Sequence, residues 1–125
     1  LVVGTSNKSE LLLGYGTIFG DLACAINPIG DIYKSDLFEL AKYLGVNDSI
    51  VKKAPSADFY EGQSDEADLG YSYSKIDSLL KKMIDENISK DELLALGFED
   101  EFIETIKKRV KINEFKRRLP IVAKI

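Results

Sequence analysis

The hydrophobic pattern of the chain begins with a short apolar run and a short amphipathic segment. Residues 1–3 are a continuous run of leucine and valine, which is typical of a parallel strand buried on both faces. We therefore expect a buried strand over residues 1–5. Small polar residues follow, and three leucines come after them, which predicts a helix over residues 6–14. Three residues are suited to cap this helix: Ser6, Asn7 and Ser9.

Glycines interrupt the next stretch, where we expect a loop over residues 14–28 and a turn at residues 28–31. Apolar residues then recur at helical spacing, which predicts a helix over residues 34–44 that Gly45 ends. Its apolar stripe comprises Leu37, Leu40, Ala41 and Leu44. A second, short helix is expected over residues 48–53.

The segment over residues 56–71 has no apolar period and is rich in acidic side chains. We expect a mobile loop there that could close over a site as a lid. Three of its carboxylates are interpreted as solvated, with a share in binding a cation as the alternative. They are Asp65, Glu66 and Asp68.

Helical periodicity dominates the rest of the chain, and it predicts helices over residues 74–85, 89–96 and 99–116. Ser74 with Asp77 resembles a capping box for the first, and Ser89 with Glu92 forms a stronger one for the second. The third has acidic residues at its start and basic residues toward its end, which complements the helix dipole. The tail, residues 119–125, is expected to be a last strand or an extended arm.

Composition narrows the class of protein. Hydrophobic residues make up 45% and charged residues 30% of the 125 residues, which is ordinary for one soluble domain with a core. A net charge of −4 argues against a general nucleic-acid binder, and no apolar run is long enough to span a bilayer. The single cysteine fits a reducing cytoplasm. The absence of histidine removes the commonest general base and the commonest zinc ligand.

The order of elements predicts an α/β fold, with part of a doubly wound parallel sheet followed by a helical C-terminal region. The chain begins with Leu1, inside the predicted strand. Because a lone parallel strand cannot bury both of its faces, we expect at least two further parallel strands upstream.

Four polar residues of the first half could bind ligands, two beyond the end of the predicted strand, one at a helix start and one in a turn. Thr5 ends the predicted strand, and Glu10, one turn into the helix, can reach a hard cation. The ammonium group of Lys34 suits a phosphate, and Ser56 is presented by the turn after Pro55. Together they predict a site for Mg²⁺ and a polyphosphate. Each residue alone also has a structural explanation, such as a carboxylate beside a helix N-terminus.

Six segments resemble NAD synthetase, in the family's order and at compatible spacing, and they cover nearly the whole chain. The first four are Gly-Thr-Ser-Asn-Lys-Ser-Glu (4–10), Gly-Tyr-Gly-Thr-Ile-Phe-Gly-Asp (14–21), Asn-Pro-Ile-Gly-Asp-Ile-Tyr-Lys (27–34) and Lys-Lys-Ala-Pro-Ser-Ala-Asp (52–58). The match continues in Tyr-Ser-Lys-Ile-Asp (73–77) and Phe-Lys-Arg-Arg-Leu-Pro (115–120). The resemblance implies the Rossmann-like, ATP-pyrophosphatase form of the doubly wound fold.

Within that fold we divide the single domain fragment, residues 1–125, into three parts. Residues 1–56 are the expected nucleotide-binding part, residues 57–72 the lid loop, and residues 73–125 the helical C-terminal part.

The resemblance implies a cytoplasmic, homodimeric ligase. Such enzymes use ATP to adenylate the nicotinate carboxylate of deamido-NAD and release pyrophosphate, and ammonia then displaces AMP to give NAD. Neither nucleic acid nor a membrane is an implied partner. Carried over position by position, the residues implied to bind ATP are Thr5, Lys34 and Ser56; the one implied to bind Mg²⁺ is Glu10; and those implied to bind deamido-NAD are Phe115 and Lys116.

Several features depart from the family's pattern. Its pyrophosphate-binding loop, Ser-Gly-Gly-x-Asp-Ser, belongs upstream of Leu1, so we expect this chain alone to be inactive. Ile18, Ala25 and Phe115 stand where some relatives carry a basic residue, an acid and a histidine, so the contacts to deamido-NAD should differ in detail. The short C-terminus after Pro120 favours free ammonia over ammonia delivered by a glutaminase domain.

Two other functions remain open at this point. A second ATP-pyrophosphatase ligase, of the GMP synthetase or tRNA-thiolating kind, would keep the sheet and change the acceptor. A non-catalytic dimerisation module would leave the chemistry to its partner.

Overall fold

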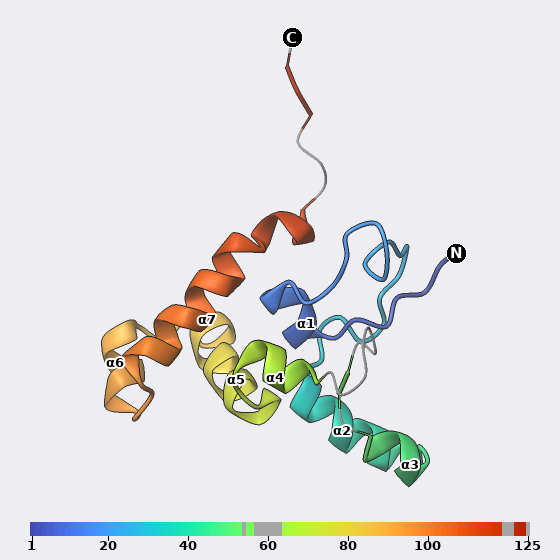
Figure 1. Cartoon of the computed structure of the whole chain (residues 1–125), viewed down its shortest axis with the longest axis horizontal. Helices are drawn as coiled ribbons and strands as arrows, with labels where there is room; N and C mark the ends of the chain where they lie inside the picture. The colour runs from blue at the N-terminus through green and yellow to red at the C-terminus, as the bar shows by residue number, and fades with distance from the viewer. Residues whose placement is uncertain (54, 57–63, 119–121, 125) are drawn as a thin grey trace.

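The computed structural model describes residues 1–53, 55–56, 64–118 and 122–124. Its elements in this part of the chain are almost all helical (Figure 1). In chain order they are α1 (Lys8–Leu13), α2 (Lys34–Tyr43), α3 (Asp48–Val51), α4 (Asp65–Leu69), α5 (Tyr73–Leu80), the π-helical turn η1 (Lys81–Asp85), α6 (Lys90–Ala95), α7 (Asp100–Ile112) and the 3₁₀ turn η2 (Glu114–Arg117).

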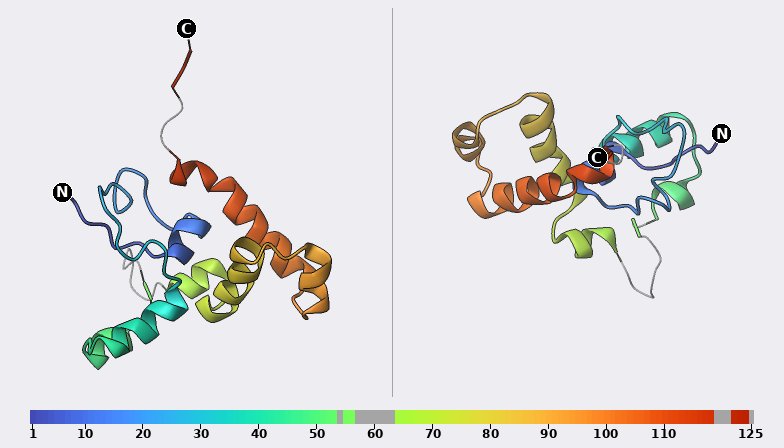
Figure 2. Two further views of the ribbon diagram at one scale, coloured as in Figure 1. Left: turned by 180° about the vertical axis from the view of Figure 1, so that it is seen from behind. Right: turned by 90° about the horizontal axis from the view of Figure 1, so that it is seen from above.

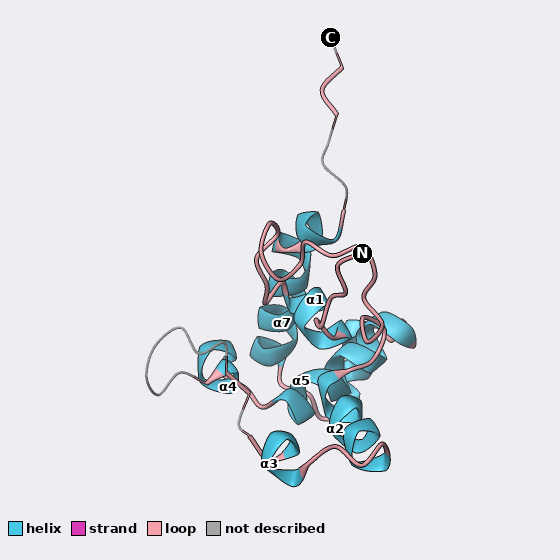
Figure 3. Cartoon of the chain, turned by 90° about the vertical axis from the view of Figure 1, so that its right-hand side faces the viewer, coloured by secondary structure: helices cyan, strands magenta, loops and turns pink. Residues whose placement is uncertain are grey.

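The predicted buried strand over residues 1–5 does not form in the described residues, which Figure 3 shows as helices and loops. Val3 and Ile26 make an isolated parallel bridge, in which the Gly4 N–H donates to the Ile26 carbonyl at 2.7 Å. Val2 and Val3 are 63% and 59% exposed, so the expectation of burial is wrong. A parallel strand is buried only where neighbours pair with both of its edges and helices cover both of its faces. The segment at Ile26 supplies one edge alone.

The helix α1 confirms the predicted helix over residues 6–14, and a capping box begins it. The Asn7 side chain accepts from the Glu10 N–H at 3.1 Å, and the Glu10 carboxylate accepts from the Asn7 N–H at 3.1 Å. Ser9 lies inside the helix and does not cap it. Gly14 ends α1 in the left-handed region, at φ 67°, where a side chain would also clash with Asn113.

The predicted helices over residues 34–44 and 48–53 are confirmed as α2 and α3. Figure 1 shows them projecting to one side of the chain. The apolar stripe of α2 is only half-buried, and Leu44 is 67% exposed.

The expected loop over residues 56–71 is wrong at residues 65–69, which form α4. Ser64 caps this helix by accepting from the Ala67 N–H at 3.3 Å, and Gly70 ends it at φ 79°. Because Asp65 and Leu69 are its buried residues, the segment has no apolar stripe that periodicity could detect. Of the predicted lid over residues 57–72, residues 57–63 lie outside the described residues, and α4 occupies part of the remainder.

The predicted helix over residues 74–85 is observed as α5 followed by η1. Ser72 caps it, so the predicted capping box of Ser74 and Asp77 is wrong. Asp77 is buried and faces α1 and α2 instead, because a tertiary contact replaces the local one.

The last predicted helices are confirmed, with one interruption. Ser89 and Glu92 form the expected capping box of α6. The helix expected over residues 99–116 divides at Asn113 into α7 and η2, with the acidic and basic ends as predicted. Residues 122–124 have no regular secondary structure, and the rest of the predicted tail lies outside the described residues.

One hydrophobic core joins the helices. It lies mainly between α5 and α7, and α1 packs against both of these helices. Figure 2 shows the helices from α5 to η2 on one side and the loops of residues 1–33 on the other. Its buried members are Leu13, Tyr33, Leu69, Tyr73, Ile76, Leu79, Leu80, Leu93, Phe102, Ile103 and Ile106.

Candidate functional site

A cleft of about 770 Å³ opens between α1, the loop after it, and the starts of α2 and α4. Residues from seven segments of the chain meet there, because α1 packs between α7 and the N-terminus of α2. Five of the six residues implied by the sequence to bind ligands line this cleft. They are Thr5, Glu10, Lys34, Ser56 and Lys116.

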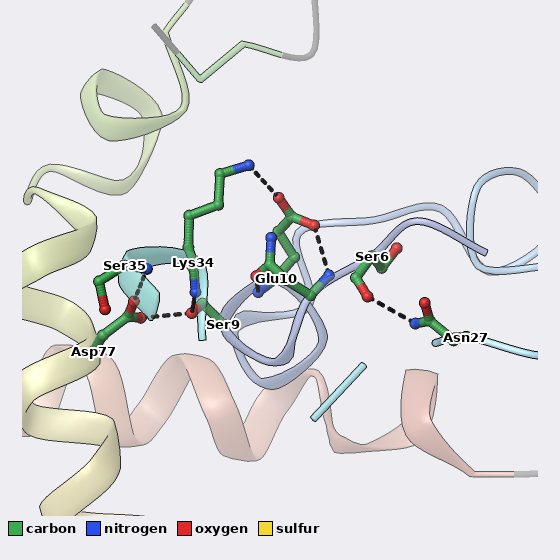
Figure 4. A network of polar contacts seen from close by, with 8 residues as sticks. Ser6, Ser9, Glu10, Asn27, Lys34, Ser35 and Asp77 are labelled. Carbon is green, nitrogen blue, oxygen red and sulfur yellow. Dashed lines mark hydrogen bonds and ion pairs between the residues drawn. The ribbon is translucent and has the colours of Figure 1, made fainter. Parts of the chain in front are cut away.

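The ion pair of Glu10 and Lys34 is the central feature of the cleft (Figure 4). One carboxylate oxygen of Glu10 is held by the Asn7 N–H, and the other accepts from the Lys34 ammonium group at 3.0 Å. The two side chains are only 15% and 19% exposed. The Lys34 ammonium group also lies 5.6 Å from the centre of the Tyr73 ring. The cleft thus holds one oxygen anion and one fixed cation side by side.

This pairing explains why a lysine is tolerated at the first position of α2. A cation at a helix N-terminus opposes the helix dipole, and the Glu10 carboxylate offsets that charge. The same two groups suit a phosphate ligand with its divalent cation, because carboxylate oxygens bind hard cations and an ammonium group binds phosphate oxygens.

The donor set for a metal ion is incomplete in the described residues. Within them, no three Asp, Glu, Cys or His side chains come close enough to hold a metal ion. Glu10 has the right chemistry for Mg²⁺, as one oxygen ligand among several. The residues present therefore fit a cation that phosphate oxygens or other groups also coordinate.

Acidic and tyrosyl side chains lie at the α4 side of the cleft, where Asp65 and Tyr15 line it. Asp65 lines the cleft and is 4% exposed, so its interpretation as a solvated loop residue is wrong. Its Oδ1 atom has no hydrogen-bond partner among the described residues. Glu66 accepts from the Tyr73 N–H at 2.8 Å, and the Tyr15 hydroxyl donates to Asp68 at 2.9 Å. Only Asp68 is exposed, as expected for a solvated carboxylate.

Tyr15, which lines the cleft, and Tyr73, next to Lys34, stay protonated at neutral pH. Burial is the main reason that the pKa of Tyr15 and that of Tyr73 both lie far above the usual value. Their hydroxyl groups can therefore donate hydrogen bonds but cannot act as bases.

Lys116 enters the cleft from the C-terminal region. Its ammonium group donates to the carbonyls of Gly14 and Gly16 at 2.7 and 2.8 Å. Phe115, its neighbour, is 58% exposed and lies outside the cleft-lining set. The structure therefore brings Lys116, and not Phe115, to the other predicted site residues.

Several further donors from the C-terminal region bind the carbonyl end of α1. Arg117 donates to the Leu11 and Leu12 carbonyls at 3.1 and 2.9 Å. Asn113 donates to the Leu13 carbonyl at 3.1 Å. These contacts satisfy carbonyls that a helix end leaves without an intrahelical partner. They also fix the loop that forms one side of the cleft.

Two comparisons with known proteins, one with family models and one with curated sequences, find the same family. The family model described as NAD synthase matches residues 1–120. The NH(3)-dependent NAD(+) synthetase of Wolinella succinogenes is 55% identical over 125 residues, which are 100% of this chain and 49% of that protein. The protein of the same name from Chlorobaculum tepidum is 52% identical over 100% of this chain and 45% of its own length. The chain spans about half the length of the curated relatives it matches.

Solved structures agree with these matches. The NH3-dependent NAD synthetase of Campylobacter jejuni, solved in complex with the nitrate ion, is 44% identical with a TM-score of 0.73. The match covers 98% of this chain and 44% of that one. The NMN synthetase of Francisella tularensis is 34% identical with a TM-score of 0.79, over 98% of this chain and 46% of that one.

Proposed function

Because the chain belongs to the NAD synthase family, we propose that it is part of an ATP-dependent amide ligase that makes NAD from deamido-NAD and ammonia. The observation that carries this proposal is the Glu10–Lys34 pair, 3.0 Å apart, in a cleft that also gathers Thr5, Ser56 and Lys116. The chain would contribute ATP-binding groups, as part of a site for which the relatives use a chain about twice as long.

The charges of the cleft support ATP as the ligand. In the proposed complex, the Lys34 ammonium group turns from Glu10 to a phosphate oxygen. The hydroxyl groups of Thr5 and Ser56 bind further ATP oxygens. Glu10 would hold Mg²⁺, whose charge offsets the negative charge of the phosphates.

The reaction divides into two balanced steps. A carboxylate oxygen of the nicotinate ring attacks the α-phosphorus of ATP, the bond to pyrophosphate breaks, and an acyl-adenylate forms. Ammonia then attacks the acyl carbon, the bond to AMP breaks, and one proton is released. Ammonia is itself the nucleophile in the second step, and the released proton passes to solvent. Lys116, at the C-terminal side of the cleft, is proposed to bind the dinucleotide.

The assembly and location of the enzyme are further proposals. We propose a homodimer in the cytoplasm because the chain belongs to this family. We also propose a doubly wound parallel sheet, which the parallel Val3–Ile26 bridge supports and which other strands would complete. In the described residues, no helix combines the length and apolar character needed to cross a bilayer.

A second acceptor deserves a test because the Francisella tularensis neighbour is an NMN synthetase. The mononucleotide, nicotinate mononucleotide, carries the same nicotinate carboxylate as deamido-NAD and lacks the adenosine half. The chemistry of the cleft would be unchanged, and the acceptor pocket alone would differ.

One experiment separates these functions. The full-length protein that contains this chain is incubated with ATP, Mg²⁺ and ammonia, and with deamido-NAD or nicotinate mononucleotide in turn. Mass spectrometry then follows AMP together with NAD or NMN. We expect AMP and NAD in equal amounts with deamido-NAD. Turnover with the mononucleotide alone would replace the proposed acceptor. Parallel reactions contain tRNA or a purine nucleotide other than ATP as the acceptor, and AMP formation in these alone would replace the proposed reaction.

A further inference from the structure

A buried polar network lies behind the cleft and joins three helices that are distant in sequence (Figure 4). Asp77 on α5 accepts from the Ser9 hydroxyl on α1 at 2.5 Å and from the Ser35 N–H on α2 at 2.8 Å. Asp77 is 1% exposed, and Ser9 is fully buried. Burying a carboxylate costs free energy unless hydrogen bonds replace those it made to water. The contacts from Ser9 and Ser35 offset this cost for Asp77.

The network ends at the backbone of Lys34. The Ser9 hydroxyl oxygen, which donates its proton to Asp77, accepts from the Lys34 N–H at 2.9 Å. Asp77 therefore binds the first two N–H groups of α2, that of Ser35 directly and that of Lys34 through Ser9. Tyr33, at the N-cap position of α2, makes no capping hydrogen bond with its side chain. A carboxylate from another helix thus takes the place of a local cap.

The network contacts the chain directly next to both charged residues of the cleft. Ser9 precedes Glu10 on α1, and Ser35 follows Lys34 on α2. Asp77 binds both Ser9 and the Ser35 N–H, so it restrains the backbone next to Glu10 and next to Lys34. These are the two residues of the 3.0 Å ion pair. In Figure 4 the backbone of Lys34 lies next to Ser9, and its side chain reaches from there to Glu10.

We propose that Asp77, acting through Ser9, is a positioning residue for ATP binding. It sets where Lys34 and Glu10 stand in the cleft, although it touches neither of their charged groups. The proposal rests on the proposed function, because it assumes that Lys34 binds a phosphate of ATP.

The test uses Asp77→Asn and Ser9→Ala in the full-length enzyme. Asparagine keeps the volume and one accepting oxygen but loses the charge, and the Ser9 change removes one hydroxyl group. We expect either variant to raise the KM for ATP about tenfold, with the KM for the acceptor unchanged. Ile76→Val, at a buried core residue next to Asp77 in α5, is the control for lost stability. We expect it to lower the melting temperature without changing the KM for ATP.

A double-mutant cycle distinguishes positioning from general destabilisation. If Asp77 acts through Lys34, Asp77→Asn should have little further effect on the KM for ATP once Lys34 is replaced by alanine. Additive effects, or an unchanged KM in both Asp77→Asn and Ser9→Ala, would overturn the proposal. If Asp77→Asn does not fold, Ser9→Ala decides the question alone. A wild-type enzyme that forms no AMP with any acceptor would contradict the proposed function instead.

Discussion

The replacement Glu10→Gln gives the sharpest test of the cleft. Glutamine keeps the size of the side chain and can still accept from the Asn7 N–H, so the capping geometry of α1 can survive. The change removes one negative charge that lies 3.0 Å from the Lys34 ammonium group. Two consequences follow, one for stability and one for turnover.

The stability effect can be bounded from the geometry. At 3.0 Å and an effective dielectric constant of about 20, Coulomb attraction is roughly 5 kcal/mol. Desolvation of the two partly buried groups cancels most of it. Exposed pairs contribute up to about 1 kcal/mol, and breaking a buried pair costs roughly 3–5 kcal/mol. We expect Glu10→Gln to lower the free energy of unfolding by about 1–3 kcal/mol, measured by urea unfolding.

The effect on turnover should be larger than the loss of stability explains. If Glu10 is a ligand of Mg²⁺, Mg²⁺-dependent formation of AMP by the full-length enzyme should fall by about 100-fold or more, which is about 2.7 kcal/mol. Near-normal turnover at ordinary Mg²⁺ concentrations would refute the role of Glu10.

The chain offers a matched control for this experiment. Glu92 occupies the same capping-box position in α6, far from the cleft, with Ser89 as its partner. Glu92→Gln should remove the capping charge alone, with a smaller loss of stability than Glu10→Gln, and leave turnover unchanged. Equal losses in both variants would mean that Glu10 matters only as a cap.

Three further predictions concern charge and backbone. Lys34→Ala should raise the KM for ATP about tenfold or more in steady-state kinetics, and an unchanged KM would contradict its phosphate role. Gly14→Ala should lower the free energy of unfolding by about 1–3 kcal/mol, more than Gly45→Ala, because both have positive φ but only Gly14 faces a clash. Equal losses would contradict this. The hydrogen bond from Lys8 lowers the pKa of Asp85, so its stabilisation is present above about pH 4 and is lost as the pH falls through the lowered pKa. Urea unfolding of Asp85→Asn should therefore differ from wild type at pH 7 and converge with it in acid, and a constant difference would refute the linkage.

Helices with local start and stop signals could be predicted from the sequence. The capping box of Ser89 and Glu92 and the charge gradient of α7 are interactions between near neighbours, so they appear in the sequence as they do in the structure. The helix α4 was not predicted, because its only buried residues are Asp65 and Leu69. A pattern of apolar positions does not include an acidic residue. Its remaining signals were Ser64 before it and Gly70 after it.

The sheet could not be established in the same way. A strand is buried by neighbouring strands and helices that come from elsewhere in the sequence. The apolar run at residues 1–3 shows that the segment is suited to burial, but it does not identify those neighbours. In the structure, Val3 has one bridging partner, Ile26, and stays largely exposed.

Some residues of the candidate site could be named from the sequence and others could not. Those that could not be named make contacts with residues far away in the sequence. The resemblance to a family named Glu10 and Lys34, and the structure places them together. The role of Asp77 could not be foreseen, because its partner Ser9 lies 68 positions away and a local capping box offered a simpler explanation. Long-range contacts of buried polar groups leave no periodic signal in a sequence.

The contacts at the carbonyl end of α1 have a consequence for the order in which the molecule matures. Lys116 leaves the ribosome about a hundred residues after the loop carbonyls that it binds, those of Gly14 and Gly16. A chain translated only as far as α7 lacks the donors of η2, so the carbonyls of Gly14 and Gly16 would have to bind water instead. The wall of the cleft next to Glu10 is therefore complete only once η2 has been made.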